Sequence, residues 1–445
     1  MTTASWAKKR VSPAEAAGMV KSRQRVGMGW SPGDPQTLQE ALLERREELH
    51  DVRLGPLNGE ANLVEEFCSE RSLGHFDVWI VYAFAYHRPA LAERTIDWAP
   101  PMLGLFPRMG QNGRSDVNAS DIYMVRLSPP DANGYCSFGT AIWQNKYALL
   151  HSKTVIAEID DTYIRPCGDG YVHESEIDYW VESAHPGARA EVAMASPDDA
   201  EVADVIGAFA STLIHDGDTI QIGSGSASAA LYDHLRSKND LGLHTEVAEE
   251  AAIDLVESGV ITNRYKNIDT GITVASWYRG KRNIIERIDN NPKYQVRDVS
   301  YVDNPRVCAQ IDNFVAINAA LAVDLGGQIT AESFGYRLYT GPGGQPELMT
   351  GALLSDGGRN MICLPSTAVN GSKSRIVMGH EEGTAITTPR HFVDYVITEY
   401  GIAELFGQTL RQRAANLISI SHPAHRDQLS EAAVKLYGPL PAPIS

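Results

Sequence analysis

The sequence predicts an α/β protein made of two similar open α/β domains with mainly parallel sheets. First, a strand, a glycine-rich turn and a helix occur twice, as RVGMGWSPGDPQTLQEAL and as DGDTIQIGSGSASAALYDHL. Second, β-rich runs such as TVIAEI, FVAIN and DYVITEY alternate with helical segments such as EEAAIDLVESG. This alternation is typical of parallel strands joined by crossover helices. The repeat indicates two related halves, the alternative being a chance recurrence of a common α/β pattern.

The helix that precedes each repeated unit begins with a recognisable signal. Ser12-Pro13-Ala14-Glu15 combines an N-cap serine, a first-turn proline and a capping-box glutamate. Ser196-Pro197-Asp198-Asp199 opens a second helix that runs to about Leu213, with acids suited to its positive end. The boundary between the halves is expected in HPGARAEVAMASPDD. We therefore expect an N-terminal domain over residues 1–187 and a C-terminal domain over residues 188–445.

Length and charge exclude several classes of function. The 445 residues, 43% of them hydrophobic and 21% charged, suffice for two folded domains. The net charge of −17 argues against nucleic acid and anionic membrane surfaces as partners, because both need a basic footprint. A small anion remains possible as a ligand, since a few local donors suffice to bind it.

The sequence also predicts a cytoplasmic protein without membrane segments. Its most apolar stretch, VWIVYAFAY, is about half the length of a spanning helix. The start, MTTASWAKKRV, has no apolar core of a secretory signal. Five cysteines without CxxC spacing favour reduced thiols over disulfides or a zinc site, and we expect no bound metal.

Glycine clusters mark three candidate sites. Gly29-Trp30-Ser31-Pro32-Gly33 matches a nucleophile elbow, but Pro32 lacks the N–H that would line the oxyanion hole. Gly223-Ser224-Gly225 follows a strand and precedes a helix, so its amides face an anion or simply form a tight turn. In YTGPGGQPELMTG, Gly343 and Gly344 suit backbone donors aimed at an oxyanion, with a structural turn as the alternative.

Acidic residues cluster in LGLHTEVAEEAAIDLVESG. Glu246 precedes the helix of this segment and is a candidate catalytic carboxylate at the end of a short apolar stretch. The other acids follow a helical period and indicate a solvated face: Glu249, Glu250, Asp254 and Glu257.

Several segments together resemble the acetyl-CoA hydrolase/transferase family, most closely its 4-hydroxybutyrate or butyrate:acetate CoA-transferase branch. They include LSPPDANGYCSFG, LGLHTEV, GPGGQ, SRIVMGHEEGTAITTPR and YVITEYGIAELFGQTLRQRA, and the resemblance covers nearly the whole chain. It implies two α/β domains of CoA-transferase type, a homodimer, and ping-pong transfer of coenzyme A through a glutamyl-CoA thioester.

The resemblance also assigns roles to residues. It implies that Glu246, in His244-Thr245-Glu246, is the catalytic glutamate and that Gly343 and Gly344 supply backbone donors. It places the CoA-contacting turn on five residues: Gln221, Ile222, Gly223, Ser224 and Gly225. Val247 and GPGGQPEL depart from the family pattern and leave acceptor specificity open.

The expected activity is transfer of coenzyme A between an acyl-CoA and a short-chain acid such as acetate, with no tightly bound cofactor. The alternatives are an acyl-CoA hydrolase that uses Glu246, a non-catalytic ligand-binding protein, and a sugar-phosphate isomerase-like enzyme. Because coenzyme A is polyanionic, we expect a local break in the negative potential at the glycine turns.

Overall fold

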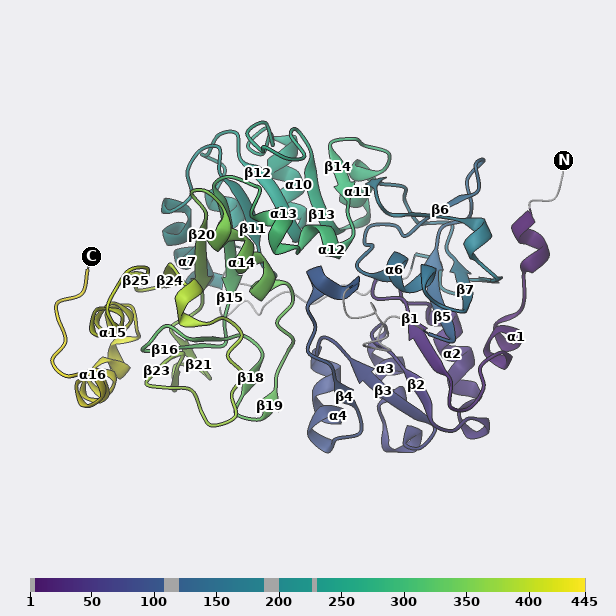
Figure 1. The fold of residues 1–445 in the computed structure, drawn as a ribbon, viewed down its shortest axis with the longest axis horizontal. Helices are drawn as coiled ribbons and strands as arrows, with labels where there is room; N and C mark the ends of the chain where they lie inside the picture. Colours follow the sequence, from purple (N-terminus) through teal and green to yellow (C-terminus); the bar gives the residue numbers. More distant parts are fainter. Residues whose placement is uncertain (1–4, 108–119, 188–199, 226–229, 445) are drawn as a thin grey trace. The chain divides into compact units, whose positions relative to one another are not determined.

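The computed structural model describes residues 5–107, 120–187, 200–225 and 230–444 (Figure 1). The chain divides into two compact units. The first unit comprises Met1–Val192 and Ala275–Val302, and the second comprises Ala193–Val274 and Asp303–Ser445. The expected C-terminal domain, 188–445, thus contains a segment that the structure groups with the first unit.

Backbone pairing explains why Ala275–Val302 belongs to the first unit. Strand β14 (Tyr294–Val296) pairs in parallel with β8 (Cys167–Gly168). An antiparallel bridge joins Ala141 to Trp277, with hydrogen bonds from the Ile142 and Tyr278 amides on either side of it. Strand β13 (Thr273–Tyr278) carries the chain from the second unit into the first.

The first unit contains a seven-stranded parallel sheet. Its strand order is β10 (Tyr179–Glu182), β7 (Thr154–Ile159), β5 (Ile122–Leu127), β1 (Arg25–Met28), β2 (Val52–Leu54), β3 (Phe76–Ile80) and β4 (Asp97–Trp98). Its described α-helices are α1 (Pro13–Gly18), α2 (Gln36–Glu44), α3 (Ala61–Phe67), α4 (Arg88–Glu93), α6 (Asn145–Leu150), α11 (Arg282–Ile285) and α12 (Val299–Val302), and its remaining strands are β6 (Tyr135–Ser137) and β9 (Tyr171–His173).

The second unit is built on parallel strands with one antiparallel edge. Their order is β25 (Gly401–Glu404), β24 (Tyr395–Thr398), β20 (Arg359–Cys363), β15 (Phe314–Ala319), β11 (Thr219–Ile222) and β12 (Gly242–Ala248). Its described α-helices are α7 (Ala200–Thr212), α9 (Leu231–His234), α10 (Glu250–Glu257), α13 (Pro305–Cys308), α14 (Gln345–Leu354), α15 (Leu410–Ser419) and α16 (Pro423–Tyr437).

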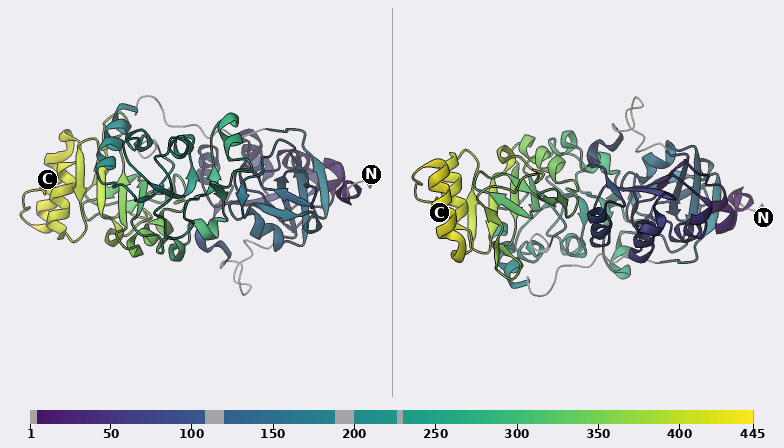
Figure 2. Two further views of the ribbon diagram at one scale, coloured as in Figure 1. Left: turned by 90° about the horizontal axis from the view of Figure 1, so that it is seen from above. Right: turned by 90° about the horizontal axis from the view of Figure 1, so that it is seen from below.

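Short strands complete the second unit. They form a three-stranded sheet of β17 (Ile329–Thr330), β16 (Ala322–Asp324) and β23 (Ile376–Val377), and two hairpins, β18 (Ser333–Phe334) with β19 (Arg337–Leu338) and β21 (Thr367–Ala368) with β22 (Lys373–Ser374). Figure 2 shows α15 and α16, in yellow, packed side by side next to β25.

The two sheets share a strand order, which confirms the expected repeat. In each, the first strand (β1 or β11) is central, the second (β2 or β12) pairs on one side, and later strands extend the other side: β5, β7 and β10 in the first sheet, and β15, β20, β24 and β25 in the second. The Ser12–Glu15 capping box forms at α1 as expected. The second helix start, Ser196–Asp199, lies outside the described residues, and α7 ends at Thr212.

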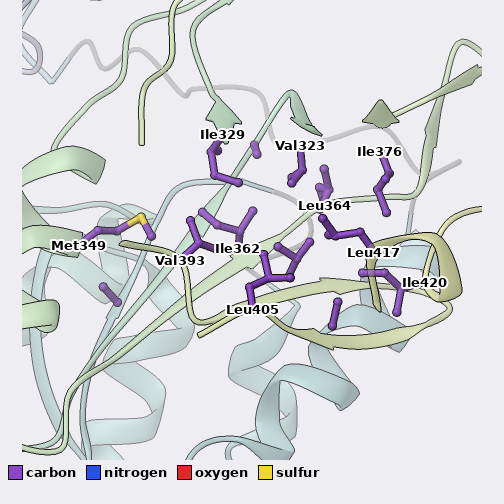
Figure 3. Close-up of a cluster of buried hydrophobic side chains, with 14 of the residues drawn as sticks. Val323, Ile329, Met349, Ile362, Leu364, Ile376, Val393, Leu405, Leu417 and Ile420 are labelled. Atoms are coloured by element: carbon purple, nitrogen blue, oxygen red, sulfur yellow. The ribbon is translucent and has the colours of Figure 1, made fainter. Parts of the chain in front are cut away.

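The core of the second unit fixes the helix that reaches the candidate site. Figure 3 shows buried side chains of β16, β17, β20 and β23 packed with Met349 of α14 and Leu417 of α15. Helix α14 contributes Leu348 and Met349, which are 1% and 0% exposed. The described part of the chain has no helix long and apolar enough to span a bilayer.

Candidate active site

Glu246 lies on β12, near the end of the strand. All other residues of β12 are buried, and Glu246 is partly exposed. In a parallel α/β sheet, ligands bind at the carboxyl ends of the strands. The sequence placed Glu246 just before α10, at the end of an apolar stretch, and the structure agrees with that position.

The N-terminus of α14 lies against the Glu246 carboxyl group. Gly344 is the N-cap of α14, and its amide donates a 2.6 Å hydrogen bond to Glu246 Oε2, 98 positions away along the chain. Pro346 falls in the first helical turn, where a missing N–H costs nothing. A helix N-terminus stabilises a negative charge, so this geometry favours the carboxylate form of Glu246.

Both glycines before α14 are required by geometry. Gly343 has φ +57°, a left-handed conformation that side chains disfavour. A Cβ atom on Gly344 would collide with Asp303 Oδ2 and would lie 2.5 Å from Glu246 Oε2. A Cβ on Gly343 would lie 3.6 Å from Glu246 Oε2, which is ordinary contact. The backbone of this loop therefore approaches the carboxyl group more closely than any side chain permits.

Two further acids lie near the N-terminus of α14. Sequence reasoning did not assign Asp303, and it noted Glu347 only as part of the departure GPGGQPEL from the family pattern. Asp303, 0% exposed, lies beside Gly344, and Glu347, 2% exposed, lies in the first turn of α14. Asp303 precedes Asn304, the N-cap of α13, in a D-N-P sequence that signals only a helix start. How much negative charge remains near Gly344 depends on how many of these three carboxyl groups hold a proton.

Burial dominates the acidity of this cluster. It raises the pKa of Glu246 to about 7, although hydrogen bonds with Gly344 and Asp303 act in the opposite direction. Burial, together with the negative charges of Glu246 and Glu347, holds the pKa of Asp303 well above its ordinary value. A carboxylate that acts as a nucleophile must be charged, so a desolvated one needs hydrogen-bond donors. The structure supplies a donor, and a pKa near 7 leaves the carboxyl group divided between its two protonation states.

The glycine turn Gln221–Gly225 lies at the same edge of the sheet as Glu246. Strand β11 pairs with β12 in a register that aligns Ile220 with Leu243, and the Thr245 hydroxyl reaches the Ile222 carbonyl oxygen at 3.5 Å. The structure thus brings the turn and the glutamate together, as their predicted roles require.

The donors of this turn are fewer than the sequence suggested. The Gly223 amide donates to the Ile317 carbonyl oxygen at 2.8 Å, as a continuation of the pairing with β15. The buried Gln221 side chain pairs with Asn318, whose amide nitrogen lies 3.0 Å from Gln221 Oε1. These groups shape the strand end and are already engaged within the protein.

A metal site does not form among the residues that the structure describes. Within these ranges, no group of three or more His, Cys, Asp or Glu side chains is arranged to hold a metal ion.

Two solved structures of similar sequence share the fold of this chain. The chain superimposes on RipA from Yersinia pestis with a TM-score of 0.87 and 29% identity, over 98% of this chain and 99% of that one. It superimposes on 4-hydroxybutyrate CoA-transferase from Porphyromonas gingivalis with a TM-score of 0.77 and 28% identity, over 97% and 99% of the two chains. The two α/β units with mainly parallel sheets are therefore of CoA-transferase type.

The chain belongs to the acetyl-CoA hydrolase/transferase family and is a CoA-transferase. The family's N-terminal domain matches residues 1–187 and its C-terminal domain matches residues 280–433. The 4-hydroxybutyrate coenzyme A transferase of Clostridium kluyveri is 35% identical over 95% of this chain and 96% of its own. The succinyl-CoA:cyclohexane-1-carboxylate CoA transferase of Geobacter metallireducens is 36% identical over 96% and 95%.

Proposed function

We propose that the protein transfers coenzyme A between an acyl-CoA and a short-chain carboxylic acid through a thioester formed on Glu246. The observation that carries this proposal is the Gly344 amide, 2.6 Å from Glu246 Oε2 at the N-terminus of α14. This arrangement gives a partly exposed carboxylate a fixed donor and a fixed orientation, both of which a nucleophile needs.

The first half-reaction needs no group beyond the two reactants. A Glu246 carboxylate oxygen attacks the thioester carbonyl carbon, the carbon–sulfur bond breaks, and CoA thiolate leaves a mixed anhydride on Glu246. The thiolate then attacks the Glu246 carbonyl carbon and breaks its bond to the bridging oxygen. The original acid departs as a carboxylate, and Glu246 carries coenzyme A as a thioester.

The second half-reaction repeats these steps with another acid. The incoming carboxylate attacks the glutamyl thioester and expels the thiolate, which takes the acyl group and restores ionised Glu246. Each tetrahedral intermediate carries an oxyanion, and the Gly343 and Gly344 amides are the proposed donors to it. Loss of one such donor typically costs about 3–4 kcal/mol.

The remaining assignments belong to the same proposal. The turn formed by Gln221, Ile222, Gly223, Ser224 and Gly225 contacts coenzyme A, which is a substrate, and no tightly bound cofactor is needed. The five cysteines are free thiols, which supports a cytoplasmic location. A homodimer is proposed from the family resemblance, and light scattering of the purified protein tests it.

The decisive experiment traps the intermediate. The enzyme is incubated with acyl-CoA, treated with borohydride or hydroxylamine, and mapped by mass spectrometry, with Glu246→Gln and the exposed Glu257→Gln as matched variants. The modification is expected at residue 246 in the wild type and in Glu257→Gln, with loss of modification and transfer in Glu246→Gln. Modification elsewhere, or a Glu246→Gln enzyme with most of its rate, contradicts the proposal.

A second measurement separates transfer from hydrolysis. Release of free CoA is followed with and without added acetate. A transferase forms acetyl-CoA and needs the second acid for turnover. Steady CoA release without any acid would instead assign water as the acceptor.

A further inference from the structure

The carboxyl group of Asp303 is buried without a hydrogen-bond donor to stabilise its charge. Both of its oxygen atoms are inaccessible, and neither accepts a hydrogen bond from the residues that the structure describes. An ionised carboxylate in such a place costs several kcal/mol, so buried acids without donors generally hold a proton. We therefore expect the carboxyl group of Asp303 to hold a proton.

Asp303 and Glu246 meet at one point of the structure. A Cβ on Gly344 would collide with Asp303 Oδ2 and would lie 2.5 Å from Glu246 Oε2, so the two carboxyl groups lie close together beside the same glycine. Carboxyl groups this close do not both ionise, because the second charge is repelled by the first. When one of them holds a proton, the pair forms a hydrogen bond that two carboxylates cannot form.

The surroundings decide which carboxyl group keeps the proton. Glu246 has the Gly344 amide, the N-terminus of α14 and contact with solvent. Asp303 accepts no hydrogen bond from the described residues and has no contact with solvent. When the pair carries one negative charge, that charge therefore resides on Glu246 and the remaining proton on Asp303.

The other titratable groups that act on Asp303 reinforce this division. Glu347 acts from α14 and Cys308 from α13, in addition to Glu246 from β12. All three are acids, and ionisation of any of them opposes a charge on Asp303. Burial and the charge of Asp303 also hold the pKa of the Cys308 thiol well above its ordinary value, so this thiol stays neutral.

We propose that Asp303 is a positioning residue that stays protonated and donates a hydrogen bond to the Glu246 carboxylate. The inference rests on the proposed function of Glu246 and deepens it. The donated bond orients the nucleophile together with the Gly344 amide and limits the pair to one negative charge. Loss of the Asp303 proton at alkaline pH replaces this bond with repulsion between two carboxylates and displaces the nucleophile.

Two substitutions separate the hydrogen bond that Asp303 donates from the ionisation of its carboxyl group. Asp303→Asn keeps the size of the side chain and an N–H donor but cannot ionise, whereas Asp303→Ala removes the donor. Asp312→Asn, at an exposed position nine residues along, is the matched control. We expect kcat/KM of the wild type and of Asp312→Asn to fall at alkaline pH. Asp303→Asn should stay within about tenfold of the wild type near neutrality and lose this alkaline fall.

Asp303→Ala should lose about tenfold to hundredfold in kcat/KM near neutrality. Difference infrared spectra, recorded at a pH above the Glu246 pKa of about 7 so that Glu246 is ionised, should show a protonated carboxyl band in the wild type that disappears in Asp303→Asn. If Asp303→Ala does not fold, the Asp303→Asn pH profile and the infrared band still decide. An unchanged alkaline fall in Asp303→Asn, a surviving band, or an Asp303→Ala enzyme within twofold of the wild type would each overturn the inference.

The trapping experiment keeps this test distinct from that of the proposed function. If Glu246 forms the adduct in both the wild type and Asp303→Asn while the pH profile is unchanged, only the role of Asp303 is wrong. If no adduct forms on Glu246 in the wild type, the proposed function itself is wrong.

Discussion

Replacement of Gly344 by alanine tests how closely the loop before α14 must approach the nucleophile. The added Cβ would lie 2.5 Å from Glu246 Oε2, whereas unbonded heavy atoms at optimal separation lie about 3.5 Å apart. The Glu246 carboxyl group must therefore move by about 1 Å. A displacement of about 1 Å costs roughly a hundredfold in rate, or about 2.7 kcal/mol in the activation free energy. Gly344 has a negative φ, so the backbone itself tolerates alanine.

The assay is kcat/KM for CoA transfer from an acyl-CoA to acetate, combined with thermal unfolding. Gly379→Ala is the matched control, because a Cβ there meets no atom within 4 Å and its φ is not in the left-handed region. We expect a large loss of activity in Gly344→Ala and no change of activity or unfolding in Gly379→Ala. Because the buried Asp303 must also move, Gly344→Ala should lose about 1–3 kcal/mol of unfolding free energy but still fold.

Two results would refute the reasoning. The first is a Gly344→Ala enzyme within twofold of the wild-type rate, which would show that the close approach has no consequence for catalysis. The second is an equal loss of activity in Gly379→Ala, which would show that the assay reports a general effect of glycine replacement.

Four further outcomes are expected. Gly343→Ala should lose about 1–2 kcal/mol of unfolding free energy in urea titrations, because of its left-handed φ, but less than tenfold in activity. Burial raises the pKa of Glu246 from its ordinary value to about 7. The contribution of Glu246 to folding stability is therefore complete at a pH below its ordinary pKa and is lost as the pH rises through 7. The unfolding free energy of Glu246→Gln should depend less on pH than that of the wild type. Met349→Ala should cost about 2–5 kcal/mol, and the exposed Leu354→Ala on the same helix less than about 0.5 kcal/mol. Arg126→Leu should cost about 3–5 kcal/mol in the same titration, because it leaves two buried acids, Glu158 and Asp160, without their shared cation.

The repeated architecture was predictable because its signals are local. A capped helix, a β-rich run and a glycine turn each occupy a few consecutive residues, and their order specifies a parallel α/β unit. The return of Ala275–Val302 to the first unit was not predictable in this way. It depends on a two-residue pairing between β14 and β8, whose residues lie more than a hundred positions apart. No local sequence pattern predicts which strand β14 pairs with.

Residues of the site were predictable only where a sequence motif or a local structural rule applied to them. Glu246 stood out through its position and the family resemblance, while Asp303 sits in an ordinary helix-start sequence, and its importance comes from burial beside Gly344. The start of α14 carried a usable signal, since proline and an acid in its first turn are typical of a helix N-terminus. The Gly223 amide donates its hydrogen bond to β15 because the two strands pair, and the sequence of the turn alone does not predict that pairing.

The excursion of Ala275–Val302 into the first unit has a consequence for how the protein is made. The first unit is incomplete until residue 302 has left the ribosome, and by then β11 and β12 have already been synthesised. The second unit in turn waits for the segment that starts at Asp303. Neither unit corresponds to one continuous stretch of gene, and a truncation near residue 190 separates the first unit from its Ala275–Val302 segment. During synthesis, β11 and β12 are therefore made before β14 completes the first unit and before the rest of the second unit exists.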